Sequence, residues 1–297
     1  MCDLSPISFT VIILILLVVD LFWHKRDHVL SFKEALWASA FWVSLALLFN
    51  IGVYYCRGKE PALEFLAAYL IEESLSIDNL FVFLLIFKYF HIEGKYQHKI
   101  LFWGILGAIV FRALFIWVGL ELVKEFHWVL TIFALFLIYA GIKMVMPQKD
   151  MDPEKNFVIK LTKRFFPVTT EHNGKFIYQK AITPLMLALI SVETSDIVFA
   201  LDSIPAVFAI TRDPFIVYTS NIFAILGLRS LYFALSGLLN TFVYLHFALA
   251  AILIFVGVKM IIEPYYHIPV GYSLAFIFGT LGVAFGAGRE YSQKPKQ

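Results

Sequence analysis

Two short stretches place carboxylates inside segments that are otherwise strongly apolar. The first runs from Glu72 to Asn79, and the second runs from Glu193 to Pro205. They share one pattern, an acid followed by five residues, an aspartate and a short polar side chain, which matches Glu72 with Asp196, Asp78 with Asp202 and Asn79 with Ser203. An ionisable side chain in hydrocarbon costs roughly 2.5–3.5 kcal/mol. Retaining several of them favours a cation site within a membrane.

The side-chain types in these stretches narrow the choice of ion. Carboxylate, amide, hydroxyl and carbonyl oxygens suit a hard divalent ion such as Mn²⁺, Mg²⁺ or Ca²⁺. Neither stretch contains Cys or His, which disfavours Cu⁺ or a thiolate zinc site. The predicted metal ligands are Glu72, Asp78, Glu193, Asp196 and Asp202, and the supporting groups are Asn79, Ser203, Asn221 and the Leu201 carbonyl.

Helix geometry restricts how these acids meet one ion. On an ideal helix, Glu72 and Asp78 lie about 9 Å apart along the axis and about 120° apart around it. Either the helix unwinds near them, or Asp78 meets Asp202 from the second stretch. Pro205 predicts unwinding in the second stretch, because a proline has no N–H to donate to the Leu201 carbonyl.

A purely structural role for the acids is the alternative. In that case Arg112 and Arg229 would neutralise them as buried, charge-balancing ion pairs. Five predicted ligands face two arginines, so three negative charges remain for protons, a metal ion or both. This surplus favours the cation site. Glu73 is left out of the set because it could lie nearer the surface or face elsewhere.

The composition predicts a polytopic, all-α membrane protein as the scaffold for these groups. Of 297 residues, 60% are hydrophobic and 15% are charged, whereas soluble domains carry about 25% charged residues. A span needs about 20 apolar residues. Nine runs of that kind form one transmembrane domain over residues 1–297, at 7–23, 34–55, 61–87, 100–122, 127–146, 181–211, 214–236, 241–263 and 270–288. Cys2 and Cys56 show no metal or redox spacing and are interpreted as incidental thiols.

The lysines and arginines predict the orientation. With the N-terminus outside and the C-terminus inside, most of them lie on the cytoplasmic side, including seven in the long connection 147–180. That basic loop could bind anionic lipid head groups. A plain solvated loop is the alternative that we favour from sequence.

Two units of three spans repeat along the chain, over 61–146 and 181–263. Ile138–Met144 resembles Ile254–Met260, and Arg112–Phe115 resembles Arg229–Tyr232. Because three is an odd number, consecutive units must be inverted in the membrane, an arrangement common in transporters. Spans 7–23, 34–55 and 270–288 lie outside the repeat.

The acidic stretches resemble the two signatures of the TerC/Alx family of integral membrane proteins. The first likeness is Tyr69–Asn79, and the second runs from Glu193 through Ala206 and on through Thr219–Asn221 to Arg229. The resemblance implies a multi-pass protein of the bacterial inner membrane that exports Mn²⁺, and it carries over the five acids as site residues. It also brings an older label of tellurium resistance. At position 73 the chain has Glu where Lys is expected in the Alx branch.

The leading hypothesis is a secondary Mn²⁺ exporter driven by proton exchange, with metal ions, protons and the lipid bilayer as its partners. The alternative is a membrane factor in redox, tellurite or metal stress that binds metal without moving it. No nucleotide-binding, HExxH or Ser/His arrangement is present, so we predict no enzyme, no organic cofactor and no nucleic-acid partner. The sequence predicts no oligomeric state.

Overall fold

The computed structural model is an all-α bundle. It describes residues 11, 13, 31–126, 128–146, 162, 164, 166–169, 174–236, 244–266 and 268–293. Within these ranges eight helices are found: α2 (Phe32–Arg57), α3 (Lys59–Tyr89), α4 (Gly94–Glu125), α5 (Trp128–Val145), α7 (Pro184–Phe208), α8 (Pro214–Ser236), α9 (Leu245–Ile262) and α10 (Val270–Gln293).

These helices match eight of the nine predicted spans. Six of them are long and apolar enough to cross a membrane, namely α2, α4, α5, α7, α8 and α10. Helix α3 is long enough but carries Glu72, Glu73 and Asp78, and the apolar part of α9 is slightly shorter. Most of the predicted span 7–23 and most of the connection 147–180 lie outside the described residues.

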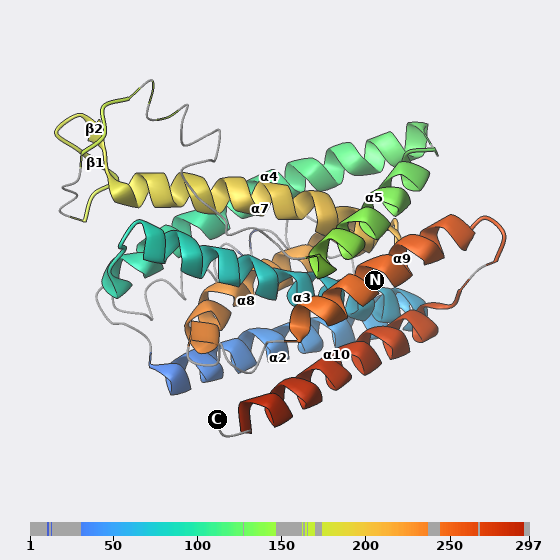
Figure 1. Cartoon of the computed structure of the whole chain (residues 1–297). Helices are drawn as coiled ribbons and strands as arrows, with labels where there is room; N and C mark the ends of the chain where they lie inside the picture. Colours follow the sequence, from blue (N-terminus) through green and yellow to red (C-terminus); the bar gives the residue numbers. More distant parts are fainter. Residues whose placement is uncertain are drawn as a thin grey trace.

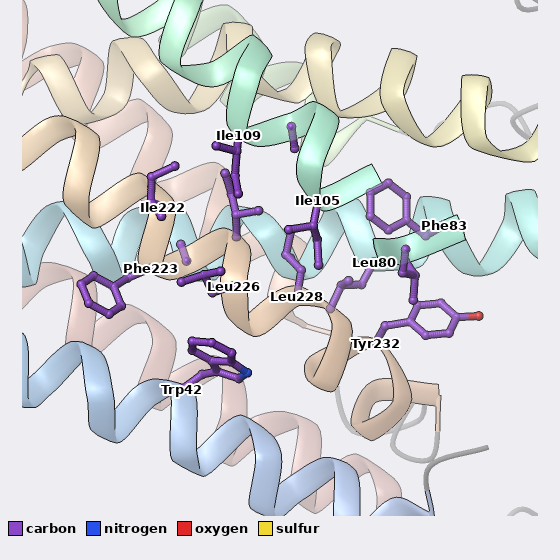
Figure 2. Close-up of a cluster of buried hydrophobic side chains, with 14 of the residues drawn as sticks. Trp42, Leu80, Phe83, Ile105, Ile109, Ile222, Phe223, Leu226, Leu228 and Tyr232 are labelled. Atoms are coloured by element: carbon purple, nitrogen blue, oxygen red, sulfur yellow. The ribbon is translucent and has the colours of Figure 1, made fainter. Parts of the chain in front are cut away.

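Helix α8 lies at the centre of the bundle. In its apolar stretch 89% of the residues are buried, against 22% in α2 and α5. Helices α2, α3 and α4 pack around it. Figure 2 shows the resulting core, with Trp42 of α2, Leu80 and Phe83 of α3, and Ile105 and Ile109 of α4 around Ile222, Phe223, Leu226, Leu228 and Tyr232 of α8.

Polar contacts at the helix ends fix the directions of the central helices. Near the start of α3, Glu64 accepts a hydrogen bond from Thr211, which follows the end of α7, so α3 and α7 are antiparallel. Near the start of α4, Gln97 accepts one from Tyr232 near the end of α8, so α4 and α8 are also antiparallel. Helix α7 also packs against α4, and the five predicted acids lie on α3 and α7.

Helices α5 and α9 form a second, closely packed unit. A Cβ atom on Gly141 would lie 2.8 Å from the Ala250 carbonyl oxygen and 2.7 Å from Ile254. A Cβ atom on Gly257 would lie 2.7 Å from the Ala134 carbonyl oxygen and 2.8 Å from Ile138. The contacts are reciprocal, because residues 134, 138 and 141 of α5 correspond to residues 250, 254 and 257 of α9, each 116 positions later in the chain. Only glycine allows the two backbones to approach this closely.

A short β-hairpin precedes α7 and was not predicted from the sequence. Strand β1 (Ile177–Tyr178) pairs with β2 (Ala181–Ile182), and the two turn residues Gln179 and Lys180 both have positive φ, as a type I′ turn requires. In Figure 1 this hairpin projects beyond the end of the bundle at which α7 begins.

One sequence-based interpretation of the cysteines is wrong. Cys56, near the end of α2, is disulfide-bonded and is therefore not an incidental thiol. Spacing along the chain carries no information on which segments the fold brings together, so it could not have indicated this bond.

Candidate functional site

Arg112 lies at the centre of a buried polar network between four helices. It extends from α4, and its partners are Glu72 of α3, Asp196 of α7 and Asn221 of α8. The side chain of Arg112 is 1% exposed and that of Glu72 is 0% exposed. The network is therefore sealed from solvent and lipid in this state.

The hydrogen bonds of this network are short and directional. Arg112 binds Asp196 through two parallel bonds, Nε to Oδ2 at 3.1 Å and Nη2 to Oδ1 at 3.0 Å. Its Nη1 donates to Glu72 Oε2 at 2.6 Å and to Asn221 Oδ1 at 3.3 Å. Asn221 Nδ2 then donates to Glu72 Oε1 at 2.6 Å, which closes the ring. A bidentate arginine–carboxylate pair is among the strongest hydrogen-bonded pairs in proteins.

The ring joins the two repeat-related acids through one arginine. Glu72 and Asp196 occupy corresponding positions of the two acidic stretches, and Arg112 neutralises one of their two charges. For these two acids the structure matches the ion-pair alternative considered from sequence. The remaining carboxylate charge needs a proton or another cation, because an uncompensated buried charge is costly.

Ser203 adds a further oxygen beside this ring. Its side chain is buried next to Glu72, and its Oγ has no hydrogen-bond partner of good geometry among the described residues. Asn79, its counterpart in the first stretch, is also buried. The hydroxyl of Ser203 is thus free to bind a proton donor or a cation near Glu72.

Glu193 lies one helical turn before Asp196 on α7. Its carboxylate occupies the space that a side chain at Gly107 of α4 would fill. The Oε2 atom of Glu193 is buried and has no hydrogen-bond partner among the described residues. Glu193 is therefore near the ring, but it is not part of it.

Among the described atoms, neither Asp202 nor Asp78 forms a hydrogen bond or ion pair with the ring. Asp202 is half-buried and interacts electrostatically with Lys143 of α5. The backbone of Asp78 lies in α3, and its side chain lies outside the described residues. Arg229, the second predicted charge-balancing residue, is buried in α8.

Neither the unwinding predicted near Pro205 nor the alternative of unwinding near Glu72 and Asp78 is observed. Helix α3 is continuous from Lys59 to Tyr89, through Glu72 and Asp78. Helix α7 is continuous across Pro205, so the predicted unwinding is wrong. Pro205 has no N–H to donate to the Leu201 carbonyl, and the helix continues through it among the buried neighbours Ser203, Ile204, Ala206 and Val207. The side chain of Leu201 is 49% exposed and lies on the outer face of α7.

Glu73 is a partly buried acid that was left out of the predicted ligand set. Its carboxylate faces Gly227 of α8 and lies near Tyr69, one turn earlier on α3. Its Oε2 atom is buried without a geometric hydrogen-bond partner among the described residues. The signal that could have located it is Gly227, because a glycine on the facing helix leaves room for a long side chain.

The ring borders a small cavity between α3, α4, α7 and α8. Its volume is about 10 Å³, and Asp196 is its polar wall, with Phe83, Gly104, Ala108 and Val192 among the others. That volume is about the minimum for one water molecule. Across the described part of the chain, no three carboxylate, imidazole or thiol groups converge to hold a metal ion. The five predicted ligands are therefore not assembled around one point in this state.

Comparison with known proteins places the chain among bacterial membrane proteins. The model of the integral membrane protein TerC family matches residues 57–296. An uncharacterised membrane protein of Myxococcus xanthus is 48% identical over 94% of this chain and 90% of its own length. A protein of Escherichia coli strain K12 named "putative membrane-bound redox modulator Alx" is 44% identical over 94% of this chain and 92% of its own length. No solved structure matches.

Proposed function

The chain belongs to the TerC family of integral membrane proteins, and on this basis we propose that it is a secondary transporter. It exports a divalent metal ion, Mn²⁺, across the bacterial inner membrane, and protons move in the opposite direction. The exchange takes place at the carboxylates within the membrane. The observation that carries the proposal is the sealed ring of Glu72, Asp196 and Asn221 around Arg112.

Arg112 occupies the position that a cation needs in order to bind these carboxylates. The oxygens around its guanidinium belong to Glu72, Asp196 and Asn221, and the hydroxyl of Ser203 lies beside Glu72. Carboxylate, amide and hydroxyl oxygens of this kind are ligands for a hard divalent ion. Mn²⁺ and Arg112 therefore compete for the same two acids, and the described state is the one in which the arginine holds them.

The other acids provide the rest of the path. Glu193 lies one turn from Asp196, and its Oε2 lacks a partner. Asp202 lies further along α7, near Lys143. A metal ion that enters from the cytoplasm displaces protons or Arg112 from these groups. Protons that enter from outside release the metal, because they neutralise the carboxylates that bind it.

The antiparallel packing of equivalent helices supports an inverted repeat. Helix α3 is antiparallel to α7, and α4 is antiparallel to α8. The contacts of Gly141 and Gly257 are reciprocal across α5 and α9. A pseudo-two-fold axis in the membrane plane relates all three pairs in this proposal, and such an axis is typical of alternating-access transporters.

The second candidate function is a membrane factor that binds metal or senses redox state without net transport. The observation in its favour is the name of the Escherichia coli relative, which describes a putative redox modulator. Metal binding at the same carboxylates would be common to both functions. Only transport moves the ion from one side of the membrane to the other.

Flux through purified protein in sealed vesicles separates the two functions. We expect Mn²⁺ to cross the membrane of vesicles that contain the protein, and to cross it faster when a proton gradient of opposite direction is imposed. Protons should cross in the direction opposite to the metal ion. A metal-sensitive and a pH-sensitive dye report the two fluxes. Saturable metal binding with no flux in either gradient would instead favour the binding factor.

A further inference from the structure

A two-stranded hairpin with one bridged segment beside it lies at the end of the bundle where α7 begins. It consists of residues 166–169 and 174–182, and we call it the interfacial platform. Strands β1 and β2 form its hairpin, and Val168 forms a parallel bridge to Ile182. Thr169 N donates to the Ile182 carbonyl, and Ile182 N donates to the Pro167 carbonyl. This segment belongs to the connection 147–180, for which the sequence favoured a solvated loop over lipid binding.

The platform is anchored to α4 and α7. Thr183, the residue before α7, donates from Oγ1 to the carbonyls of Lys175 and Phe176, at 2.8 Å and 2.9 Å. Lys99 of α4 donates to the Gly174 carbonyl at 2.7 Å and lies over the ring of Phe176. Ile182 is buried against Leu187 and its neighbours. These contacts hold the platform at a fixed place beside the starts of α4 and α7.

The platform exposes apolar side chains outside the bundle. Phe166 is 56% exposed, Val168 is 42% exposed and Ile177 is 58% exposed. Ile177 and Val168 both pair with Ile182, so they lie on either side of it in the sheet. Exposed apolar side chains gathered in one small segment favour an apolar partner.

Exposed cations flank these apolar side chains. Lys175 and Lys180 lie in the platform itself, and Arg164 lies two residues before Phe166. The platform residues include no acid. Amphipathic segments with basic residues beside exposed apolar ones insert at the boundary between lipid head groups and acyl chains. Each basic residue near an anionic surface contributes about 1 kcal/mol.

We propose that the interfacial platform docks onto the anionic lipid head groups of the membrane in which the protein is embedded. Ile177, Val168 and Phe166 enter the head-group boundary, and Lys175, Lys180 and Arg164 contact the lipid phosphates. Figure 1 is consistent with this placement, because the hairpin lies directly beyond the first turn of α7, where that helix leaves the bundle. The inference does not depend on metal transport.

A fluorescent reporter on the platform tests the docking. The full-length chain carries Ile177→Cys, with Cys2→Ser and Cys56→Ser to leave one thiol, and an environment-sensitive dye on that thiol. It is reconstituted in vesicles of neutral phospholipid alone and in vesicles that also contain anionic phospholipid. We expect blue-shifted emission, quenching by brominated acyl chains and protection from iodide in the anionic vesicles. Tyr265→Cys, in the exposed turn between α9 and α10 at the opposite end of the bundle, is the control position.

Charge variants identify the cause of the docking. Lys175→Gln, Lys180→Gln and Arg164→Gln together should abolish the difference between neutral and anionic vesicles. Each single change should lower the ratio of docked to undocked platform about fivefold, which corresponds to about 1 kcal/mol per charge. High salt should mimic these changes by screening. The matched control removes three exposed cations from the opposite end of the bundle, by Lys59→Gln, Lys124→Gln and Arg212→Gln, and should leave the reporter signal unchanged.

Two outcomes would overturn the proposal. In the first, iodide quenches the dye at position 177 equally well in both kinds of vesicle, which would mean that lipid does not cover the platform. The other is a dye shielded equally in neutral and anionic vesicles and indifferent to salt, which would mean that anionic head groups are not the partner. Circular dichroism of every variant confirms that the helical bundle is intact.

Discussion

At the scale of single residues, Arg112 decides the charge state of the buried ring. It binds Asp196 with two bonds and Glu72 with a third, all out of contact with solvent. Truncating one member of such a pair strands the others and costs about 3–5 kcal/mol, whereas replacing the whole set by neutral groups is often tolerated. The ring can therefore be tested for stability and for function separately.

We predict that Arg112→Gln lowers the thermal midpoint of the protein in detergent by several degrees, because Glu72 and Asp196 are left without a counter-charge. Adding Glu72→Gln and Asp196→Asn to that variant should recover most of the lost stability, since no buried charge remains. Metal flux should stay absent in the triple variant. Thermal unfolding and vesicle flux measure the two effects.

The exposed pair of Arg57 and Asp213 is the control for the Arg112 variants. The Arg57 Nη1 and Asp213 Oδ2 atoms are 2.7 Å apart, but both side chains are more than a third exposed. Exposed pairs contribute about 0–1 kcal/mol, so Arg57→Gln should change the midpoint little. A midpoint for Arg112→Gln equal to that of the unmodified protein would contradict the charge assignment of the ring.

A second prediction at this scale concerns the paired aspartates. Asp78→Asn and Asp202→Asn should each reduce Mn²⁺ flux to background while the protein still folds, because each change removes an anionic oxygen and keeps the side-chain shape. Glu121→Gln removes a carboxylate from an exposed pair with Lys124 and should leave the flux unchanged. Full flux in both aspartate variants would rule out the carboxylate mechanism.

The residues of the ring were only partly predictable from the sequence. The acids and Arg112 stand out because charged side chains are rare inside apolar spans. Asn221 was only a supporting candidate, yet it bonds both Glu72 and Arg112. The way in which one arginine binds both acids depends on the relative positions of α3, α4 and α7, and residue spacing within one helix does not contain that information.

At the scale of helices, the sequence predicted the ends of the spans well. It wrongly predicted a break at Pro205 and did not predict the short hairpin before α7. Apolar length fixes where a span begins and ends, and the predicted 34–55 and 214–236 correspond to Phe32–Arg57 and Pro214–Ser236. The break at Pro205 is absent, because neighbouring helices can hold a proline within a membrane helix. The hairpin at Ile177–Ile182 escaped prediction, because its turn residues Gln179 and Lys180 are not the usual Asn-Gly or Asp-Gly.

The packing of α5 against α9 gives the prediction at this scale. Gly141→Ala and Gly257→Ala should each destabilise the protein by about 1–3 kcal/mol, the usual cost of overpacking, because each new methyl group meets a backbone carbonyl of the facing helix. Gly282→Ala in α10 is the matched control, because no atom lies near its added methyl group. Alanine is intrinsically the better helix former, so this control should be neutral or slightly stabilising.

Thermal unfolding of the three glycine variants measures this contrast. The two α5–α9 variants should unfold at lower temperature than the unmodified protein, and the α10 variant should not. If all three behaved alike, the close approach of α5 and α9 would not contribute to stability.

At the scale of the whole molecule, the contacts between helix ends sort into two groups. Arg57 with Asp213 and Glu64 with Thr211 lie at one end of the bundle. Gln97 with Tyr232 and Lys99 with Gly174 lie at the other end. Each of α3, α4, α7 and α8 therefore runs from one group to the other. The distribution of lysine and arginine predicts that the second group lies on the cytoplasmic side and the first group outside.

The last prediction tests this orientation in intact cells. A cysteine at Tyr265 should react with a membrane-impermeant thiol reagent added outside, because the turn after α9 lies at the end predicted to be outside and Tyr265 is 90% exposed. A cysteine at Gln179, in the exposed turn of the platform, should react only after the membrane is permeabilised. Both variants carry Cys2→Ser and Cys56→Ser, so that each has one thiol. The reverse pattern would place the platform outside and would reverse the proposed direction of metal movement relative to the fold. Reaction at both positions before permeabilisation would contradict the odd number of spans between them, and with it the inverted repeat on which the transport proposal relies.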